Sequence, residues 1–142
     1  MFSNNRDSYR QAFVEAWRKR LNKLPAEPLE QLIADVVQLH PEYHPLLKNT
    51  QEAVEKDFDE TTGQQNPFFH MGMHITLMEQ VITDRPAGIQ KAYRQLLRKQ
   101  QNQHQVEHAM MDCLGESLRQ AQQNTGGAPD EQAYLQCVLK LL

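Results

Sequence analysis

The sequence predicts an all-α protein, a single helical domain over residues 1–142 built as a bundle of five or six helices. Apolar residues recur at intervals of three and four along most of the chain, which is the period of an amphipathic helix. Alternating runs of β-branched residues, the usual signal of strands, are almost absent. A chain of 142 residues is also long enough to bury a core within one domain.

The first half of the chain contains three predicted helices. The first covers residues 7–24 and ends at Pro25, because proline interrupts helical hydrogen bonding. The second covers residues 29–39, where apolar residues share one face. The third covers residues 41–58 and begins with a proline, which suits the first helical position. Pro45 strains the first turn of this third helix, so the pattern leaves its local shape open.

Three further helices are predicted in the second half. The first covers residues 66–83, with Asn66 as its N-cap and a proline directly after it. A break at Asp-Arg-Pro-Ala-Gly separates it from a long helical pattern over residues 89–122. Because that pattern is long for a globular helix, we expect a break near Asn102. The last predicted helix covers residues 130–142.

Composition excludes several functional classes. The formal net charge is −3 and no basic block stands out, so we expect no nucleic-acid partner. No apolar run approaches the ~20 residues that span a bilayer, and the polar N-terminus has no signal-peptide pattern, so we expect no membrane association. Cys113 and Cys137 form no CxxC motif, and we interpret them as reduced thiols in a cytoplasmic protein.

All six histidines occur in pairs four residues apart. The pairs are His40 and His44, His70 and His74, and His104 and His108. Random placement of six histidines in this length gives roughly 0.2 pairs at that spacing, counted as template matches. Two imidazoles four apart on a helix lie on one face and can chelate one metal ion. The spacing therefore favours a metal site.

The predicted helical faces point several of these rings inward. His70 and His74 share a face with apolar residues, and His104, Glu107 and His108 replace apolar residues in the inward stripe of the long helix. Inward polar groups need partners, and a metal ion satisfies several imidazoles at once. In a straight antiparallel hairpin His70 and His104 would lie level, whereas His74 and His108 would be far apart. A kink near residue 102, or a second ion, would relax this separation.

The sequence thus predicts a transition-metal-binding protein with a mono- or dinuclear site. Zinc and iron suit imidazole ligands best, and copper is also compatible. If the protein is an enzyme, an open metal position would serve hydrolytic or redox chemistry. Glu107 would act as a ligand or as a proton-transfer group in catalysis. We expect a small molecule or a protein as partner, and a monomer or homodimer. The predicted ligands are His40, His44, His70, His74, His104, Glu107 and His108.

Two other interpretations compete with the metal site. The histidines would in the first form a buried hydrogen-bond network in a non-catalytic protein-interaction module. HQVEH at residues 104–108 also matches the H-x-x-E-H pattern of zinc proteases, in which the glutamate is the general base. No third ligand for that pattern is evident in the sequence.

Four motifs of the chain resemble, in kind and order, those of bacterial domain-of-unknown-function family 1841. The motifs are HPEYH at residues 40–44, NPFFHMGMH at 66–74, RPAGI at 85–89 and HQVEHAMMDCLGESLRQAQ at 104–122. The resemblance extends over nearly the full chain. It implies a bacterial single-domain protein in which the three histidine motifs belong together, and it brings no established activity.

Overall fold

The computed structural model describes residues 6–58, 66–123 and 129–142; most of these residues are helical, and none of them forms a strand. The all-α class is therefore confirmed. Backbone contacts divide the chain into two compact units, Met1–Gly72 and Met73–Leu142. The expectation of a single domain stays a prediction.

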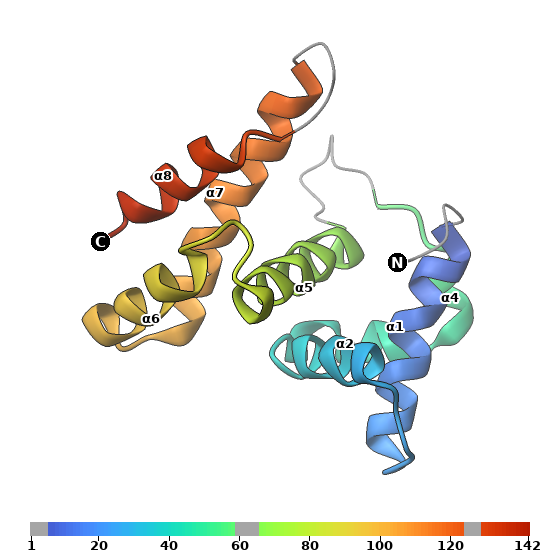
Figure 1. Cartoon of the computed structure of the whole chain (residues 1–142). Helices are drawn as coiled ribbons and strands as arrows, with labels where there is room; N and C mark the ends of the chain where they lie inside the picture. Colours follow the sequence, from blue (N-terminus) through green and yellow to red (C-terminus); the bar gives the residue numbers. More distant parts are fainter. Residues whose placement is uncertain (1–5, 59–65, 124–128) are drawn as a thin grey trace. The chain divides into compact units, whose positions relative to one another are not determined.

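The first unit is built around α1 (Arg6–Leu21), which packs against α2 (Pro28–Gln38), α3 (His44–Lys48) and α4 (Thr50–Glu55). In Figure 1, α4 runs alongside α1. A capping box starts α2. The Glu30 side chain accepts a hydrogen bond from the backbone N–H of Glu27, and the Glu27 side chain accepts one from the backbone N–H of Glu30. The buried apolar residues of this unit are Phe13, Ala16, Trp17, Ile33, Ala34, Val36, Val37, Leu47, Ala53, Val54, Phe68 and Met71.

The predicted number of five or six helices is wrong: the described residues contain eight α-helices. The segment predicted as one helix over residues 41–58 consists of the 3-10 helix η1 (Pro41–Tyr43), α3 and α4. Between α3 and α4, Asn49 adopts an extended backbone, and its side chain accepts a hydrogen bond from the backbone N–H of Glu52 at 3.1 Å. Asn49 therefore caps a new helix instead of continuing the old one.

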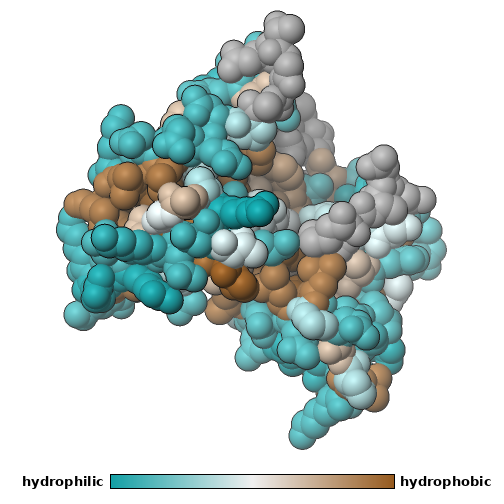
Figure 2. Space-filling model, viewed as in Figure 1, coloured by the Kyte–Doolittle hydropathy of each residue, from teal (hydrophilic) through white to brown (hydrophobic). Residues whose placement is uncertain are grey.

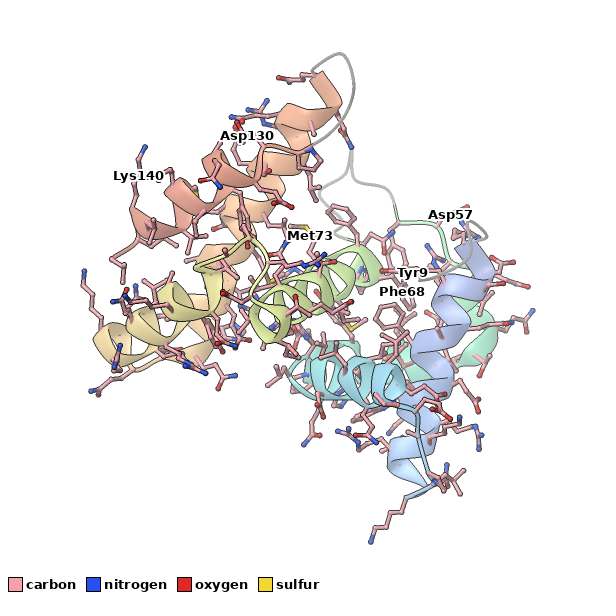
Figure 3. The ribbon with its side chains drawn as sticks, in the orientation of Figure 1. Tyr9, Asp57, Phe68, Met73, Asp130 and Lys140 are labelled. Atoms are coloured by element: carbon pink, nitrogen blue, oxygen red, sulfur yellow. A yellow bond between two sulfur atoms is a disulfide. The ribbon has the colours of Figure 1, made fainter. Side chains whose placement is uncertain are left out.

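Helix α5 (Pro67–Thr83) contributes to the cores of both units. Asn66 caps it as predicted, since its side-chain oxygen accepts the N–H groups of Phe68 and Phe69 at 2.9 and 3.4 Å. The hydroxyl of Tyr9 in α1 donates to the carbonyl of Phe68 at 3.3 Å, and Figure 3 shows the two side chains next to each other.

The second unit packs α6 (Ile89–Gln100), α7 (Gln103–Gln123) and α8 (Glu131–Leu139) against one another around a shared core. Gln101 has a left-handed backbone with φ 53°, and Asn102 caps α7 by accepting the N–H of Gln105 at 3.1 Å. The break predicted near Asn102 is thus confirmed. The buried core residues are Leu77, Val81, Ile89, Ala92, Tyr93, Leu96, Val106, Met110, Met111, Cys113, Leu114, Tyr134 and Val138.

The expectation of reduced thiols is wrong, because Cys113 of α7 and Cys137 of α8 form a disulfide. Their Cα atoms lie 5.8 Å apart although 24 positions separate them in sequence. This pairing depends on how α7 and α8 pack, and no local sequence motif predicts it. The cytoplasmic location stays a prediction, and free thiols no longer support it. None of the described helices combines the length and the apolar character needed to cross a membrane.

Candidate metal centre

Helix α5 carries His70 and His74 one turn apart, so both rings project from the same side of this helix. The helix is fixed at its start by the Asn66 cap, which places the first of the two histidines in the first helical turn. The boundary between the two units falls after Gly72. His70 therefore belongs to the first unit and His74 to the second.

In the first unit, the structure brings His40 and His70 together. Their ring centroids lie 5.0 Å apart in an edge-to-face arrangement, and a nitrogen of each ring lies within 4.8 Å of one of the other. His40 is only 1% exposed, and its Nδ1 donates to the carbonyl oxygen of Val36 at 2.8 Å. Tyr43 stacks on His40 with ring centroids 5.5 Å apart. His40 is thus held by α2 and by an aromatic neighbour, and its ring contacts that of His70.

His44 lies elsewhere in the same unit. Its ring packs against Trp17 of α1, with centroids 4.5 Å apart, and its Nε2 donates to the carbonyl of Val37 at 2.9 Å. The break of the chain into η1 and α3 sets this orientation. His44 therefore tethers α3 to α1 and α2, and its predicted place among the ligands has no support from the contacts of its ring.

In the second unit, His74 faces Glu107 in a fully buried pair. The Nε2 of His74 donates to one carboxylate oxygen of Glu107 at 2.6 Å, and both side chains are 1% exposed. The other carboxylate oxygen accepts from the hydroxyl of Tyr93 at 2.5 Å and from the amide of Gln103 at 2.8 Å. Because three donors from α5, α6 and α7 converge on one carboxylate, Glu107 links these three helices.

The pKa values of this network follow from burial and from these hydrogen bonds. Burial acts to raise the pKa of Glu107, but the hydrogen bonds from His74, Tyr93 and Gln103 stabilise the carboxylate, and the pKa is lowered overall. Burial and the neighbouring carboxylate both raise the pKa of Tyr93. Glu107 is thus held as a carboxylate that accepts hydrogen bonds, beside a tyrosine that keeps its proton.

His104 and His108 lie on the first turns of α7 and contact each other, with ring centroids 4.0 Å apart. The Nδ1 of His108 donates to the carbonyl of His104 at 2.8 Å. His108 is half-buried and lies 5.7 Å from the ring of His74, whereas His104 is exposed. The prediction that His104 faces inward is therefore wrong, because α7 begins anew at Gln103 and does not continue the inward stripe of α6.

The same break corrects the hairpin expectation. A straight helix through residue 102 would have kept His74 and His108 apart, yet the two rings are neighbours. The left-handed residue Gln101 turns the chain, so that α7 follows its own direction and returns Glu107 to His74. The break near Asn102 is confirmed, and the number of metal ions stays a prediction.

The carbonyl and carboxylate oxygens that contact His40, His74 and His108 determine which nitrogen of each ring carries the proton. A carbonyl or carboxylate oxygen only accepts hydrogen bonds, so the nitrogen facing it must be the protonated one. In the neutral ring the lone pair then lies on Nε2 of His40 and His108, and on Nδ1 of His74. Metal-binding histidines typically donate their second nitrogen to a carbonyl or carboxylate in this way. Three histidines are therefore already in a ligand tautomer.

The sequence did not assign three residues of this arrangement. Tyr93 and Gln103 bind Glu107, and Tyr43 stacks on His40. Gln103 lies four residues before Glu107, which is a spacing that allows side-chain contact on a helix. Tyr93 lies at helical spacing from Ile89 and Leu96, which places it on the apolar face, where a hydroxyl needs a buried partner. Those two signals point to the residues, but they do not identify Glu107 as the common acceptor.

A family model described as Domain of unknown function (DUF1841) matches residues 5–140. The match covers nearly the whole chain, so the protein belongs to the DUF1841 family, as the motifs indicated. Comparisons with curated proteins and with solved structures found no match.

Proposed function

We propose that the protein binds transition metal through two histidine pairs, His40 with His70 in the first unit and His74 with His108 in the second. Three of these rings are held in the ligand tautomer by hydrogen bonds of the opposite nitrogen, and this is the observation that carries the proposal. The rings occur as one contacting pair in each unit, and α5 supplies one member of each pair. Such an arrangement lowers the cost of ordering ligands around an ion.

Glu107 acts in this proposal as a positioning residue. Both carboxylate oxygens of Glu107 already accept hydrogen bonds. The bond from Nε2 of His74 fixes the orientation of this ring and increases the basicity of its Nδ1, which carries the lone pair. Three of the roughly four lone-pair sites of this carboxylate are taken by the donors His74, Tyr93 and Gln103, which leaves one site for direct ligation or proton transfer, the two roles expected from the sequence. A histidine bound to a carboxylate on one side and a metal on the other is a common metal-site arrangement.

The donor set favours zinc or iron, with copper as a further candidate. Imidazole nitrogen suits all three ions. Because both cysteines are joined in a disulfide, thiolate ligands do not contribute. Hydrolytic or redox catalysis on a small molecule would follow if the ion keeps an open position.

Elemental analysis tests the proposal. The protein is purified without an affinity tag, reconstituted with zinc, iron or copper, and its metal content per chain is measured by plasma mass spectrometry. We expect a stoichiometric metal in the wild type, whose amount distinguishes mononuclear from dinuclear binding. The double variant His70→Ala, His74→Ala should lose it while its helical circular dichroism is kept. His104→Ala, which removes an exposed ring from the same turn region, should retain it. Absence of metal from the wild type after all three reconstitutions would refute the proposal.

The second candidate is a non-catalytic interaction module with a polar core. The observation that favours it is the network around Glu107, in which both carboxylate oxygens are satisfied by protein donors alone. This candidate predicts that the wild type binds none of the three ions and that His74→Ala mainly lowers stability. The metal proposal predicts in contrast that added metal raises the melting temperature of the wild type, since a ligand that binds only the folded state stabilises it.

A further inference from the structure

The exposed face of α6 is cationic along its length. Lys91, Arg94 and Arg98 are exposed and lie at intervals of three and four residues, which places them on one side of the helix. The opposite side buries Ile89, Ala92, Tyr93 and Leu96 in the core of the second unit. Figure 2 shows a hydrophilic surface over the place that α6 has in Figure 1. The cations therefore project away from the core that holds the helix.

No acidic residue lies near this stripe in the sequence. Residues 85–105 contain five Lys and Arg residues and neither Asp nor Glu, in a chain whose formal net charge is −3. The expectation of no nucleic-acid partner rested on the net charge of the whole chain, in which the positive charge of this segment is outweighed by acidic residues elsewhere. A local cationic surface is what steers and binds an anionic polymer, even when the total charge is negative.

The stripe also lacks intramolecular counter-ions. Elsewhere Arg18 pairs with Glu15 at 2.6 Å and Arg20 pairs with Asp35 at 2.8 Å. By contrast, within residues 6–58, 66–123 and 129–142, Lys91, Arg94 and Arg98 form no ion pair. Like charges three and four residues apart destabilise a helix. The helix therefore keeps an unfavourable arrangement that an external anion would relieve.

We propose that the exposed face of α6 binds the phosphate backbone of a nucleic acid. Lysine and arginine side chains supply such phosphate contacts without any apolar anchor. Exposed amides lie at and after the end of the helix, on Gln100, Gln101, Asn102 and Gln105, and they suit hydrogen bonding to sugars and base edges. These residues are distinct from the proposed metal ligands, so this inference does not depend on the metal proposal.

Two other anionic surfaces fit α6 less well. The centre of a protein interface is usually anchored by aromatic or large apolar side chains and is depleted in lysine. The large hydrophobic residues exposed on the described chain are Leu21, Leu24, Leu39, Phe69, Ile82, Leu139 and Leu142, and none belongs to α6. A helix that lies in a membrane interface inserts its apolar face, but the apolar face of α6 is already buried.

Fluorescence anisotropy with the full chain tests the proposal. The probes are a labelled 20-base-pair DNA duplex and a labelled RNA hairpin, titrated at several salt concentrations. We expect at least one probe to bind, with an affinity that falls as salt rises. For three phosphate contacts on duplex DNA the logarithmic slope should be about −2.7. The arm with the tighter binding identifies the nucleic acid as DNA or RNA.

Two matched variants locate the binding surface. The α6 variant carries Lys91→Gln, Arg94→Gln and Arg98→Gln, and the control carries Arg6→Gln, Arg18→Gln and Arg119→Gln, so both lose three cations. All six side chains are exposed, and circular dichroism checks that both variants fold. We expect the α6 variant to lose at least tenfold in affinity and the control to stay within about twofold of wild type.

Three results would overturn the proposal. The first is no binding of either probe by the wild type at 50 mM salt. A second is an equal loss of affinity in the two variants, which would indicate unspecific attraction. The third is binding of polyglutamate or of phosphatidylglycerol vesicles as tight as that of the better nucleic acid, which would assign the surface to an acidic protein or to a membrane.

Discussion

At the scale of single residues, the buried carboxylate of Glu107 organises the polar interior of the second unit. It is 1% exposed and accepts hydrogen bonds from His74, Tyr93 and Gln103. An unpaired buried carboxylate would cost several kcal/mol, so these donors are required for the carboxylate to stay ionised. Loss of any one donor should therefore act on both stability and the pKa of Glu107.

Removal of the Tyr93 hydroxyl is the first prediction. Tyr93→Phe deletes a hydrogen bond to a charged acceptor and should lower the free energy of unfolding by about 1.5–3 kcal/mol. Tyr134→Phe is the matched control, because the Tyr134 hydroxyl donates to the neutral amide oxygen of Gln80 at 2.7 Å, and should cost about 0.5–1.5 kcal/mol. Urea unfolding measures both. Equal losses would contradict a special role of the carboxylate.

The second prediction concerns pH, in protein freed of metal by a chelator. The pKa of Glu107 is lowered in the folded state, so its carboxylate contributes stability that is fully present above the unfolded pKa of about 4.3. That contribution is lost as the pH falls through the folded pKa. The stability difference between wild type and Glu107→Gln should therefore shrink between pH 6 and pH 3. Urea unfolding at each pH would contradict this if the difference stayed constant.

At the scale of helices, close packing of α1 on the start of α5 depends on a glycine. A Cβ atom on Gly72 would lie 2.1 Å from the hydroxyl oxygen of Tyr9, which donates to the carbonyl of Phe68. Gly72→Ala should therefore displace that hydroxyl and destabilise the protein by about 1–3 kcal/mol. The ring atom Cζ of Tyr9 lies at 3.5 Å, so Tyr9→Phe should relieve the clash in the double variant.

A second helical glycine provides the control for this third prediction. A Cβ atom on Gly115 of α7 would lie 3.4 Å from the end of the flexible Met73 side chain. Because alanine is favoured over glycine in helices by up to about 1 kcal/mol, Gly115→Ala should be neutral or stabilising. Thermal unfolding of the three variants measures the contrast. A stability loss at Gly115 equal to that at Gly72 would contradict the role given to Tyr9.

The disulfide between α7 and α8 carries the fourth prediction. It closes a loop with a sequence separation of 24, and a crosslink of this size stabilises by about 3 kcal/mol through the unfolded chain. A reducing agent should therefore lower the melting temperature of the wild type, but not that of a Cys113→Ser, Cys137→Ser variant. Two free thiols in unreduced, denatured protein would contradict the pairing.

The sequence predicted helices well where local signals decide. Asn66 and the proline after it fixed the start of α5, and the need to break a long pattern located the end of α6 near Asn102. The segment over residues 41–58 was misread, because periodicity alone does not show that Asn49 caps a new helix. The disulfide was missed for a similar reason, since it arises from the packing of two separate helices.

The candidate site shows where prediction from sequence ends. The three histidine pairs were visible as spacings, but spacing does not determine which rings meet. The turn at Gln101 places the ring of His108 next to that of His74 and leaves His104 exposed. The ring of His44 packs against Trp17 instead of against a histidine of a different pair. The proton positions also depend on distant acceptors, such as Glu107 for His74.

At the scale of the whole molecule, α5 joins two cores. Phe68 and Met71 are buried in the first unit, and Leu77 and Val81 in the second. Because a helix melts cooperatively, this sharing should couple the two units, as the single-domain prediction requires. The only tryptophan, Trp17, reports on the first unit. Urea curves from Trp17 fluorescence and far-ultraviolet circular dichroism should coincide, and separate transitions would contradict coupling.

The most direct measurement of the metal proposal is long-range proton–nitrogen NMR of histidine-labelled protein, with and without saturating zinc. Without metal, we expect the lone pair on Nε2 of His40 and His108 and on Nδ1 of His74, as the hydrogen bonds require. Zinc should shift the resonances of these nitrogens and leave that of the His44 lone-pair nitrogen unchanged. Unchanged resonances of all three rings at saturating zinc would contradict the proposal and leave the histidines as a structural network.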